Sequence, residues 1–354
     1  RTLPALLALS VAGALAGCAI GPDYARPDAR LQLPDQYAAA PLSAAPAVAS
    51  NWWTLFGDAT LDELVRQALA SSPDALIAAA RIEEADAVLR QVDAALLAAC
   101  PRLRMCANVA VGFNNFDVQA MTAQGVLATN TPGVLTESTA DFAFALLMAT
   151  ARRITESEQY LREGRWQRWR YDILLGQDVH DATLGILGMG RIGQAVARRA
   201  ALGFGMPVLY HNRRRLPEAE ERACKARFVE FDALLQAADF LLLALPLTPE
   251  NRHIIGAREL RRMQPHAMLI NIARGGIVDD AALAEALRTG AIAGAGLDVF
   301  ENEPHVHPDL LAQHNVVLTP HVAGWSPEAV QNSVDRFIAN ATRHFAGQPM
   351  VSPI

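Results

Sequence analysis

The run Gly188-Met189-Gly190-Arg191-Ile192-Gly193 follows directly on an apolar segment, residues 182–187, and opens a stretch with helical spacing of apolar residues. A strand, a glycine turn and a helix in this order are typical of a dinucleotide-binding unit. The first glycine permits the tight turn, the second lets backbone approach a pyrophosphate, and the third lets the helix pack on the strand. Free N–H groups at the start of the helix would bind the phosphates. The residues we expect to bind the dinucleotide here are Gly188, Gly190, Arg191, Ile192 and Gly193.

The segments after this turn alternate between apolar strand candidates and helical patterns. This alternation predicts an α/β fold with a doubly wound, parallel Rossmann sheet. The strands expected after the turn are 207–210, 240–244, 267–272, 293–297 and 316–319. Two further strands, 103–111 and 125–130, and a helix over 137–152 are expected before it.

Composition excludes several classes of protein. The chain of 354 residues is 51% hydrophobic and 19% charged, which fits a globular protein of two or three domains. Its net charge of -6 offers no basic surface, so we expect no nucleic-acid partner. We expect no metal site, because His305, His307, His314 and His321 match no ligand spacing. The four cysteines fit neither a disulfide framework nor a zinc site: Cys18, Cys100, Cys106 and Cys224.

The first residues have the pattern of a targeting segment. Arg1 precedes an apolar run, 3–15, that is too short to span a bilayer and has the size of a signal-peptide core. The residues Leu15-Ala16-Gly17-Cys18 resemble a bacterial lipobox, in which Cys18 would become a lipidated N-terminus anchored to a membrane. Residues 21–50 are rich in Pro and Ala and are typical of a linker.

Two helical patterns follow the linker and, with the lipobox, carry a resemblance. Residues 1–95 resemble the N-terminus of outer-membrane-factor lipoproteins of efflux pumps, through the runs 15–18, 21–27, 52–58 and 61–65. That family builds a channel from barrel strands, and none are expected here. The resemblance therefore predicts only a fragment of such a protein, fused to a different protein that begins near residue 99.

The position nineteen residues beyond Gly193 indicates which dinucleotide is bound. A site for NAD usually has an acidic residue there on the ribose diol, whereas this chain has Asn212, followed by Arg213 and Arg214. Without a carboxylate nothing repels a 2′-phosphate, and guanidinium groups can bind it through two hydrogen bonds. We therefore expect NADP(H) to be favoured over NAD(H), with Asn212, Arg213 and Arg214 at the cofactor.

Three chemically active residues each follow a predicted strand: Arg274, Glu303 and His321. Ligands of open α/β sheets bind at the carboxyl ends of the strands, so these side chains should meet near the glycine turn. Together they suit reduction of a 2-keto acid. The arginine holds the carboxylate and carbonyl, and the histidine protonates the developing alkoxide. The glutamate orients the imidazole ring and favours its protonated form.

The motifs of the later part of the chain, in their order, carry a second resemblance. Residues 99–350 resemble the D-isomer-specific 2-hydroxyacid dehydrogenases, among them the glyoxylate/hydroxypyruvate reductases. The matching runs are 109–117, 130–132, 137–141, 188–193, 273–276, 297–300 and 319–321.

This resemblance implies roles for particular residues. Arg274, Glu303 and His321 would be the catalytic trio, and the backbone of Val111 and Gly112 would bind the substrate carboxylate. Thr139 and Asp298 would lie at the cofactor. A homodimer would form on the helix 137–153 and the segment through Trp166 and Trp169.

The chain departs from that family at its start. Sequences of the family begin with a strand and about two further strand–helix units, roughly 60–80 residues at about 30 per unit, which are missing here. We therefore expect the divisions 1–18 (signal segment), 19–98 (linker and helices), 99–135 with 326–354 (truncated substrate domain) and 136–325 (NADP-binding Rossmann domain). The fold would combine a Rossmann sheet, a truncated flavodoxin-like substrate domain with exposed strand edges, and a helical N-terminal extension.

Three functions remain open from the sequence. The first is reduction of small 2-keto acids such as glyoxylate or hydroxypyruvate to D-2-hydroxy acids, with turnover impaired by the missing strands. The second is a non-enzymatic lipoprotein or efflux fragment whose dehydrogenase remnant only binds nucleotide. A formate-type dehydrogenase is the third, but its chemistry has no carbonyl oxygen for Glu303 and His321 to protonate. The chemistry suggests a cytoplasmic enzyme, whereas processing at Cys18 would anchor it to a membrane.

Overall fold

The structure is a computed structural model that describes residues 57, 59–60, 62–65 and 92–354. It divides the chain into two units, Arg1–Glu83 and Glu84–Ile354. In the first unit, residues 59–60 and 62–65 are helical. The lipobox with Cys18 and most of the expected N-terminal extension lie outside the described residues. None of the helices described is long and apolar enough to cross a membrane.

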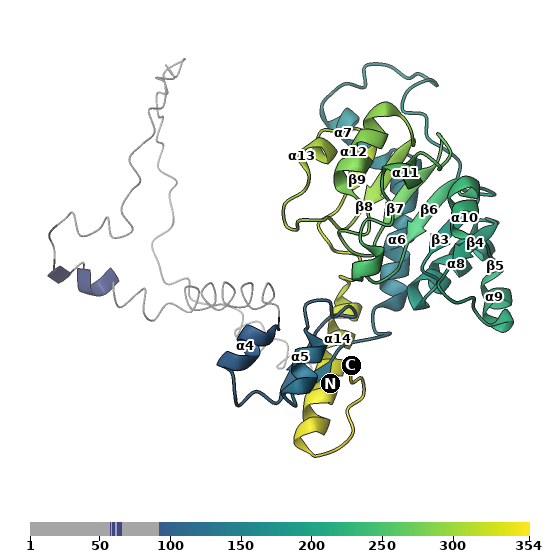
Figure 1. The fold of residues 1–354 in the computed structure, drawn as a ribbon. Coiled ribbons are helices and arrows are strands. Elements are labelled where there is room, and N and C mark those ends of the chain that lie inside the picture. The colour runs from purple at the N-terminus through teal and green to yellow at the C-terminus, as the bar shows by residue number, and fades with distance from the viewer. Residues whose placement is uncertain (1–56, 58, 61, 66–91) are drawn as a thin grey trace, which may run out of the picture. The chain divides into compact units, whose positions relative to one another are not determined.

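A parallel sheet of seven strands forms the centre of the second unit (Figure 1). The strands lie in the order β5-β4-β3-β6-β7-β8-β9, so β3, which precedes the glycine turn, lies inside the sheet and the chain winds outward from it in both directions. The predicted doubly wound sheet is confirmed. The strands are β3 (Leu184–Leu187), β4 (Val208–His211), β5 (Ala226–Phe228), β6 (Phe240–Leu243), β7 (Met268–Asn271), β8 (Gly294–Leu297) and β9 (Val316–Leu318). Only β5 was not expected, because three residues at a sheet edge carry too short a pattern to detect.

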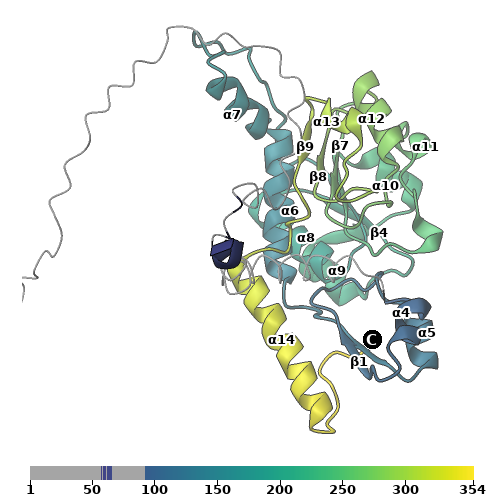
Figure 2. The same ribbon diagram turned by 90° about the vertical axis from the view of Figure 1, so that its left-hand side faces the viewer.

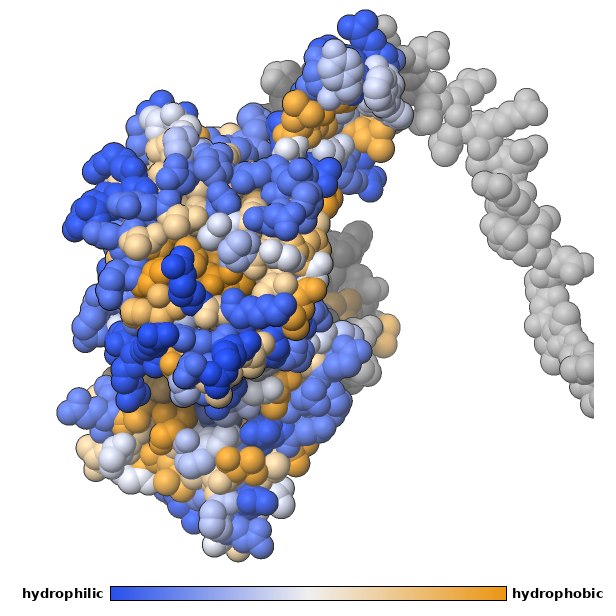
Figure 3. All heavy atoms as spheres, turned by 90° about the vertical axis from the view of Figure 1, so that its right-hand side faces the viewer, coloured by the Kyte–Doolittle hydropathy of each residue, from blue (hydrophilic) through white to orange (hydrophobic). Residues whose placement is uncertain are grey.

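Helices cover both faces of this sheet, because successive side chains of a buried strand point to opposite faces. Ile186 of β3 and Leu242 of β6 join one hydrophobic cluster, whereas Leu187 and Leu243 join the other. Figure 2 shows α6 and α8 on one side of the sheet and α10, α11 and α12 on the other. The helices are α6 (Thr136–Ala151), α7 (Ile154–Arg162), α8 (Arg191–Gly203), α9 (Glu218–Cys224), α10 (Phe231–Ala237), α11 (Ala257–Leu260), α12 (Asp280–Thr289) and α13 (Pro308–Leu311). The side that carries α9 and α10 is mostly hydrophilic, with scattered apolar patches (Figure 3).

A smaller layer, which we call the small sheet, precedes α6. Within the described residues it consists of two parallel strands, β1 (Met105–Ala107) and β2 (Leu127–Thr129). The first was expected to run over 103–111, but the chain leaves the ladder at Asn108 to form a loop. Two short helices, α4 (Ala94–Ala99) and α5 (Val118–Ala123), pack on it through an apolar cluster of Val92, Leu97, Met121, Val126 and Ala128.

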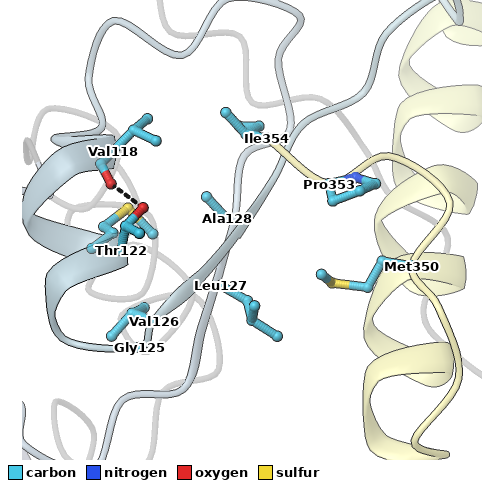
Figure 4. A pocket seen from close by; sticks show the side chains of 10 residues that line it. Val118, Thr122, Gly125, Val126, Leu127, Ala128, Met350, Pro353 and Ile354 are labelled. Carbon is cyan, nitrogen blue, oxygen red and sulfur yellow. Dashed lines mark hydrogen bonds between the residues drawn. The ribbon is translucent and has the colours of Figure 1, made fainter.

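The C-terminal segment returns to the small sheet. After the long helix α14 (Pro327–Phe345), the tail forms an antiparallel bridge between Pro353 and Thr129 of β2, and Ile354 donates its N–H to the carbonyl of Ala128. Figure 4 shows the pocket of about 170 Å³ that this leaves between the tail, α5 and β2. Its wall on α5 includes Thr122, whose hydroxyl donates to the carbonyl of Val118. The tail therefore closes the outer edge of β2.

Candidate active site

The three glycines of the turn after β3 have three different environments. A Cβ atom on Gly188, whose φ is +100°, would meet the backbone of Ala244 and Leu245, and one on Gly193 would meet the carbonyl of Gly188 at 2.5 Å. Nothing lies within 4 Å of a Cβ atom on Gly190. The first and third glycines are thus required by packing, and the second faces open space beside the start of α8. No side chain caps α8, so the N–H groups of Arg191 and Ile192 are available to phosphate oxygens.

Asn212 fixes the shape of this turn. Its Oδ1 accepts a hydrogen bond of 2.7 Å from the N–H of Met189, next to the bond from Gly188 N–H to the carbonyl of His211. Position 212 therefore carries a neutral amide, and its oxygen already accepts a hydrogen bond from the glycine turn. Such a residue does not repel the 2′-phosphate of a dinucleotide.

The three arginines after Asn212 have different roles. Arg215 forms two hydrogen bonds of 2.8 Å with Glu221 on α9, and the buried Tyr210 hydroxyl donates to the same carboxylate at 2.6 Å. Hydrogen bonds from Arg215 and Tyr210 lower the pKa of Glu221 to about 2 despite the opposing effect of desolvation. Burial and the Glu221 carboxylate together raise the pKa of Tyr210 to about 12. This network anchors the loop, whereas Arg213 and Arg214 are exposed on it.

The structure brings His321 and Glu303 together from different strand ends. His321 Nδ1 lies 2.8 Å from Glu303 Oε2, and no hydrogen bond within residues 92–354 ends on the other ring nitrogen, Nε2. His321 has a φ of 54°, an uncommon conformation for a residue with a side chain. Such strain is typical of functional sites. The expected contact between His321 and Glu303 is therefore formed, and Nε2 has no hydrogen-bond partner among residues 92–354.

Glu303 is held in its ionised form. Its Oε1 accepts the N–H of Phe300 at 2.9 Å while Oε2 faces the histidine. Desolvation alone would raise the pKa of Glu303, but the hydrogen bonds from His321 and Phe300 and the positive charges of His321 and Arg274 lower it below its usual value. The carboxylate can thus stabilise a protonated imidazole ring.

Arg274 lies between the large sheet and the loop after β1. Its guanidinium donates to the carbonyl of Ala273 at 2.7 Å and to Asn114 Oδ1 at 3.4 Å, and it fills the space that a Cβ atom on Gly112 would need. Burial lowers the pKa of Arg274, and the Glu303 carboxylate opposes that shift. The expected trio therefore meets at Glu303, which interacts electrostatically with both of its partners.

The loop around Val111 and Gly112 has free donors beside Arg274. Asn130 Nδ2 donates to the carbonyl of Val111 at 2.7 Å, and Asn108 Nδ2 donates to that of Gly112 at 2.6 Å. The carbonyls are thus tied back, and the N–H groups of these two residues make no hydrogen bond to any described part of the chain. Two N–H groups next to a guanidinium form a suitable site for a carboxylate. The bracing role of Asn108 and Asn130 was missed, since it depends on contacts across 4 and 19 residues.

Asp298 lies beneath the loop that carries His321. It is fully buried, and its two oxygens accept hydrogen bonds from the Thr319 hydroxyl at 2.7 Å and from the N–H groups of Val322 and Ala323 at 2.9 and 2.8 Å. It therefore positions the histidine. The contact with the cofactor that the resemblance implies for Asp298 stays a prediction.

Thr139 presents an unsatisfied polar group. Its hydroxyl is buried and has no hydrogen-bond partner among the described residues, and it lies 3.8 Å from the position of a Cβ atom on Gly324. Buried hydroxyls normally have a partner, so this atom fits a site that a ligand completes. The observation agrees with the expectation that Thr139 contacts the cofactor.

A second set of charges braces the Glu303 loop and was not anticipated. Glu301 accepts hydrogen bonds from Arg252 and, at 2.9 Å, from His253 Nε2, and its own N–H donates to Asp280 at 3.0 Å. Burial, reinforced by the Glu301 carboxylate, raises the pKa of Asp280. No group of three His, Cys, Asp or Glu side chains in the described part of the chain is arranged to hold a metal ion.

Comparison with known proteins shows which proteins this chain resembles. Residues 144–323 match the family model "D-isomer specific 2-hydroxyacid dehydrogenase, NAD binding domain". The chain is 51% identical over 250 residues to a glyoxylate reductase of Thermococcus gammatolerans, which covers 68% of this chain and 74% of the relative. It is 48% identical over 254 residues to a glyoxylate/hydroxypyruvate reductase B of Escherichia fergusonii, covering 70% and 78%.

A solved structure has the same fold. The NADPH-dependent glyoxylate/hydroxypyruvate reductase of Sinorhizobium meliloti, in complex with NADP and malonate, superimposes with a TM-score of 0.70 at 38% identity, covering 75% of this chain and 82% of that one. The fold, the extent of the family match and the identity to these relatives together show that the chain belongs to the D-isomer specific 2-hydroxyacid dehydrogenase family.

Proposed function

We propose that this chain reduces small 2-keto acids of the glyoxylate or hydroxypyruvate type to D-2-hydroxy acids. The observation that carries the proposal is the convergence of Arg274, the free N–H groups of Val111 and Gly112, and the His321–Glu303 pair. One part of this site binds a carboxylate and the other delivers a proton. The named activities of the relatives support the same substrate class.

The residues divide the reaction between them. The Val111 and Gly112 N–H groups and Arg274 bind the carboxylate of the keto acid, and Arg274 also polarises the carbonyl. His321 Nε2 then transfers its proton to the carbonyl oxygen, and Glu303 stabilises the ring while it is charged. When bound, reduced nicotinamide dinucleotide supplies the hydride that adds to the carbonyl carbon. The hydride and the proton from His321 together convert the carbonyl group, an aldehyde in glyoxylate and a ketone in hydroxypyruvate, into a hydroxyl group.

NADP(H) is the dinucleotide that we propose as the preferred one. The neutral Asn212 and the exposed Arg213 and Arg214 support this choice, since Arg215 is already engaged by Glu221. The Sinorhizobium meliloti relative is named as NADPH-dependent. The expected contacts of Gly188, Gly190, Arg191, Ile192 and Gly193 with the phosphates belong to the same proposal.

A homodimer is also part of the proposal. The segment after α7 exposes Trp166, Trp169 and Tyr171, with 52%, 76% and 82% of their surfaces accessible, and Ile154 at the start of α7 is also exposed. Exposed aromatic groups of this kind are enriched in interfaces. We propose that α6, α7 and this segment form the contact between two copies.

The signal segment at residues 1–18 and the division of the chain into domains also belong to the proposal. We propose that residues 99–135 with 326–354 form a substrate domain reduced to two strands, that 136–325 bind the dinucleotide, and that Cys18 carries lipid after cleavage. Measurement of the intact mass of the chain, purified from its source, tests whether Cys18 carries lipid. A mass without a lipid adduct at Cys18 contradicts it.

Oxidation of NADPH on addition of glyoxylate or hydroxypyruvate tests the activity. We expect turnover by the purified chain and a rate lower by about 10²–10⁴-fold for His321→Gln, with NADPH binding retained in both. The second candidate, a nucleotide-binding remnant without activity, is favoured by the two-stranded small sheet. Binding of NADPH without turnover by the unaltered chain would establish that candidate instead.

A further inference from the structure

The C-terminal tail holds the backbone of Asn130 on both sides. The hydroxyl of Ser352 donates to the carbonyl of Asn130 at 2.6 Å, and the N–H of Asn130 donates to the carbonyl of Ser352 at 3.3 Å. The residues next to them, Thr129 and Pro353, form the antiparallel bridge that places the tail beside β2 (Figure 4). Both backbone polar groups of Asn130 are therefore bound to one residue, 222 positions later in the chain.

Asn340 of α14 in turn fixes Ser352. Its Nδ2 donates to the Ser352 hydroxyl at 2.8 Å, and its Oδ1 accepts the N–H groups of Val351 and Ser352 at 2.9 and 3.1 Å. Asn340 is fully buried, and Ser352 and Asn130 are 6% and 9% exposed. A break in this series would leave a polar group unpaired in the interior, which is unfavourable. Because the Ser352 hydroxyl accepts from Asn340 and donates to Asn130, it links the helix to the loop after β2.

The loop after β2 orients the two free N–H groups of the substrate loop. Asn130 Nδ2 donates to the carbonyl of Val111 at 2.7 Å, and the N–H of Thr131 donates to the carbonyl of Ala110 at 3.0 Å. In a planar trans peptide group the C=O and the N–H point in opposite directions. The bond to the Val111 carbonyl therefore sets the direction of the Gly112 N–H, and the bond to the Ala110 carbonyl sets that of the Val111 N–H.

We propose that Ser352 is a positioning residue that, through Asn130, sets the directions of the two N–H groups which bind the substrate carboxylate. The inference rests on the proposed function, in which the Val111 and Gly112 N–H groups bind the carboxylate of the keto acid. It makes the C-terminal tail a part of the substrate site, although Ser352 acts only through the loop after β2.

A positioning role and a merely structural role of Ser352 have different kinetic consequences. The N–H groups bind the carboxylate equally in the ground state and in the transition state, so their misorientation raises KM and leaves kcat nearly unchanged. A tail that only fastens the fold acts differently. Its loss reduces the amount of folded protein, which lowers the apparent kcat and leaves KM unchanged.

Ser352→Ala in the full chain tests the inference. We expect KM for glyoxylate to rise by about tenfold, the size of a lost hydrogen bond to a charged group, with kcat and NADPH affinity nearly unchanged. The affinity for oxalate, an unreactive analogue with the same carboxylate, should fall equally when it is titrated calorimetrically into the chain saturated with NADP⁺. Ser352→Thr keeps the hydroxyl and should restore both values.

Ser333→Ala is the matched control. The Ser333 hydroxyl is also buried on α14, but it donates to the carbonyl of Ala329 within the helix, at 2.8 Å. Its removal should leave KM and oxalate affinity unchanged. If Ser352→Ala does not fold, Ser352→Cys retains a side chain of similar size with a weaker donor and should raise KM by a smaller factor.

A double-mutant cycle tests whether Ser352 acts through Asn130. Asn130→Ala should itself raise KM, and Ser352→Ala should add nothing further on that background, because residues that act in one series are not additive. Additive increases in KM would overturn the inference. So would a Ser352→Ala or Ser352→Cys variant with a lower kcat but normal KM and normal oxalate affinity.

The oxalate titration separates this inference from the proposed function. If the unaltered chain binds oxalate without turning over glyoxylate, the reductase is contradicted. A weaker affinity of Ser352→Ala for oxalate then still supports the positioning role, and an equal affinity overturns it. Absence of oxalate binding by the unaltered chain would overturn the carboxylate site, and the role of Ser352 with it.

Discussion

Gly275 lies so close to the carbonyl group of Phe300 that a Cβ atom at position 275 would overlap it. This contact joins the loop after β7, which carries Arg274, to the loop after β8, which carries Glu303. Backbone packing therefore sets the distance between the Arg274 guanidinium, which we propose to bind substrate, and the Glu303 carboxylate, which contacts His321. The second glycine of the pair, Gly276, has a φ of +81° and turns the chain away afterwards.

Gly275→Ala should separate these two loops. A displacement of about 1 Å costs roughly a hundredfold in rate, so we expect kcat/KM for glyoxylate to fall by about that factor while NADPH still binds. Gly203→Ala, where nothing lies within 4 Å of the added Cβ atom, is the control and should keep normal activity. Unchanged kinetics of Gly275→Ala would show that the contact does not position Arg274.

His321→Gln and Glu303→Gln should lower kcat without preventing cofactor binding. General acid catalysis contributes about 10²–10⁴-fold, and we expect a loss in that range for His321→Gln. Glu303→Gln removes the negative charge 2.8 Å from the ring and should also narrow the pH range of activity. Steady-state rates over a pH series, with NADPH affinity measured separately, check both. A variant that loses affinity for NADPH but not kcat would contradict the assigned roles.

Asn212→Asp tests the preference for NADPH. The new carboxylate keeps an oxygen for the Met189 N–H, so the turn should persist, but it repels a 2′-phosphate. Like charges a few ångströms apart near a surface cost on the order of several kcal/mol, so KM for NADPH should rise by about tenfold or more. KM for NADH, which has no such phosphate, serves as the internal control. An equal rise for both dinucleotides would mean that the turn itself had been damaged.

Asp298→Asn should reduce stability as well as turnover. The amide has one acceptor oxygen where the carboxylate has two, so a buried N–H of Val322 or Ala323 or the Thr319 hydroxyl loses its partner. A buried donor left unsatisfied costs about 1–3 kcal/mol. Urea unfolding should show a loss of that size, together with a lower kcat from a displaced His321. Equal stability of the variant would rule out the anchoring role.

Glu221→Gln should lower stability at neutral pH and less so in acid. The pKa of Glu221 is depressed from 4.5 to about 2, so its ionised form stabilises the fold above pH 4.5 and this stabilisation is lost as the pH falls toward 2. The difference in melting temperature between the unaltered chain and Glu221→Gln should become smaller as the pH falls from 4.5 toward 2. NADPH affinity should also fall, because Arg215 no longer anchors the loop of Arg213 and Arg214. A difference that is constant with pH would exclude the ion pair as its cause.

The order of strands and helices in the large sheet could be read from the sequence. Its strands are buried on both faces, so they appear as continuous apolar runs, and the glycine turn after β3 identifies the strand from which the sheet is wound in both directions. The same rule located Arg274, Glu303 and His321, because carboxyl ends of parallel strands share one edge. The local sequence pattern was sufficient to predict the strands and the residues that follow them, because each of these depends on neighbours within one strand–helix unit.

Other features depend on contacts between distant residues and so required the tertiary structure. The amide of Asn130 fixes the Val111 carbonyl, Asp298 anchors the loop of His321, and the approach of Gly275 to Phe300 joins two loops. The Rossmann sheet and the meeting of Arg274, Glu303 and His321 at its strand ends could both be predicted from the sequence alone. The folded chain was needed to show that the N–H groups of Val111 and Gly112 bond to no described residue and that Phe337 and Ile338 of α14 face outward, because both follow from hydrogen bonds formed across the fold.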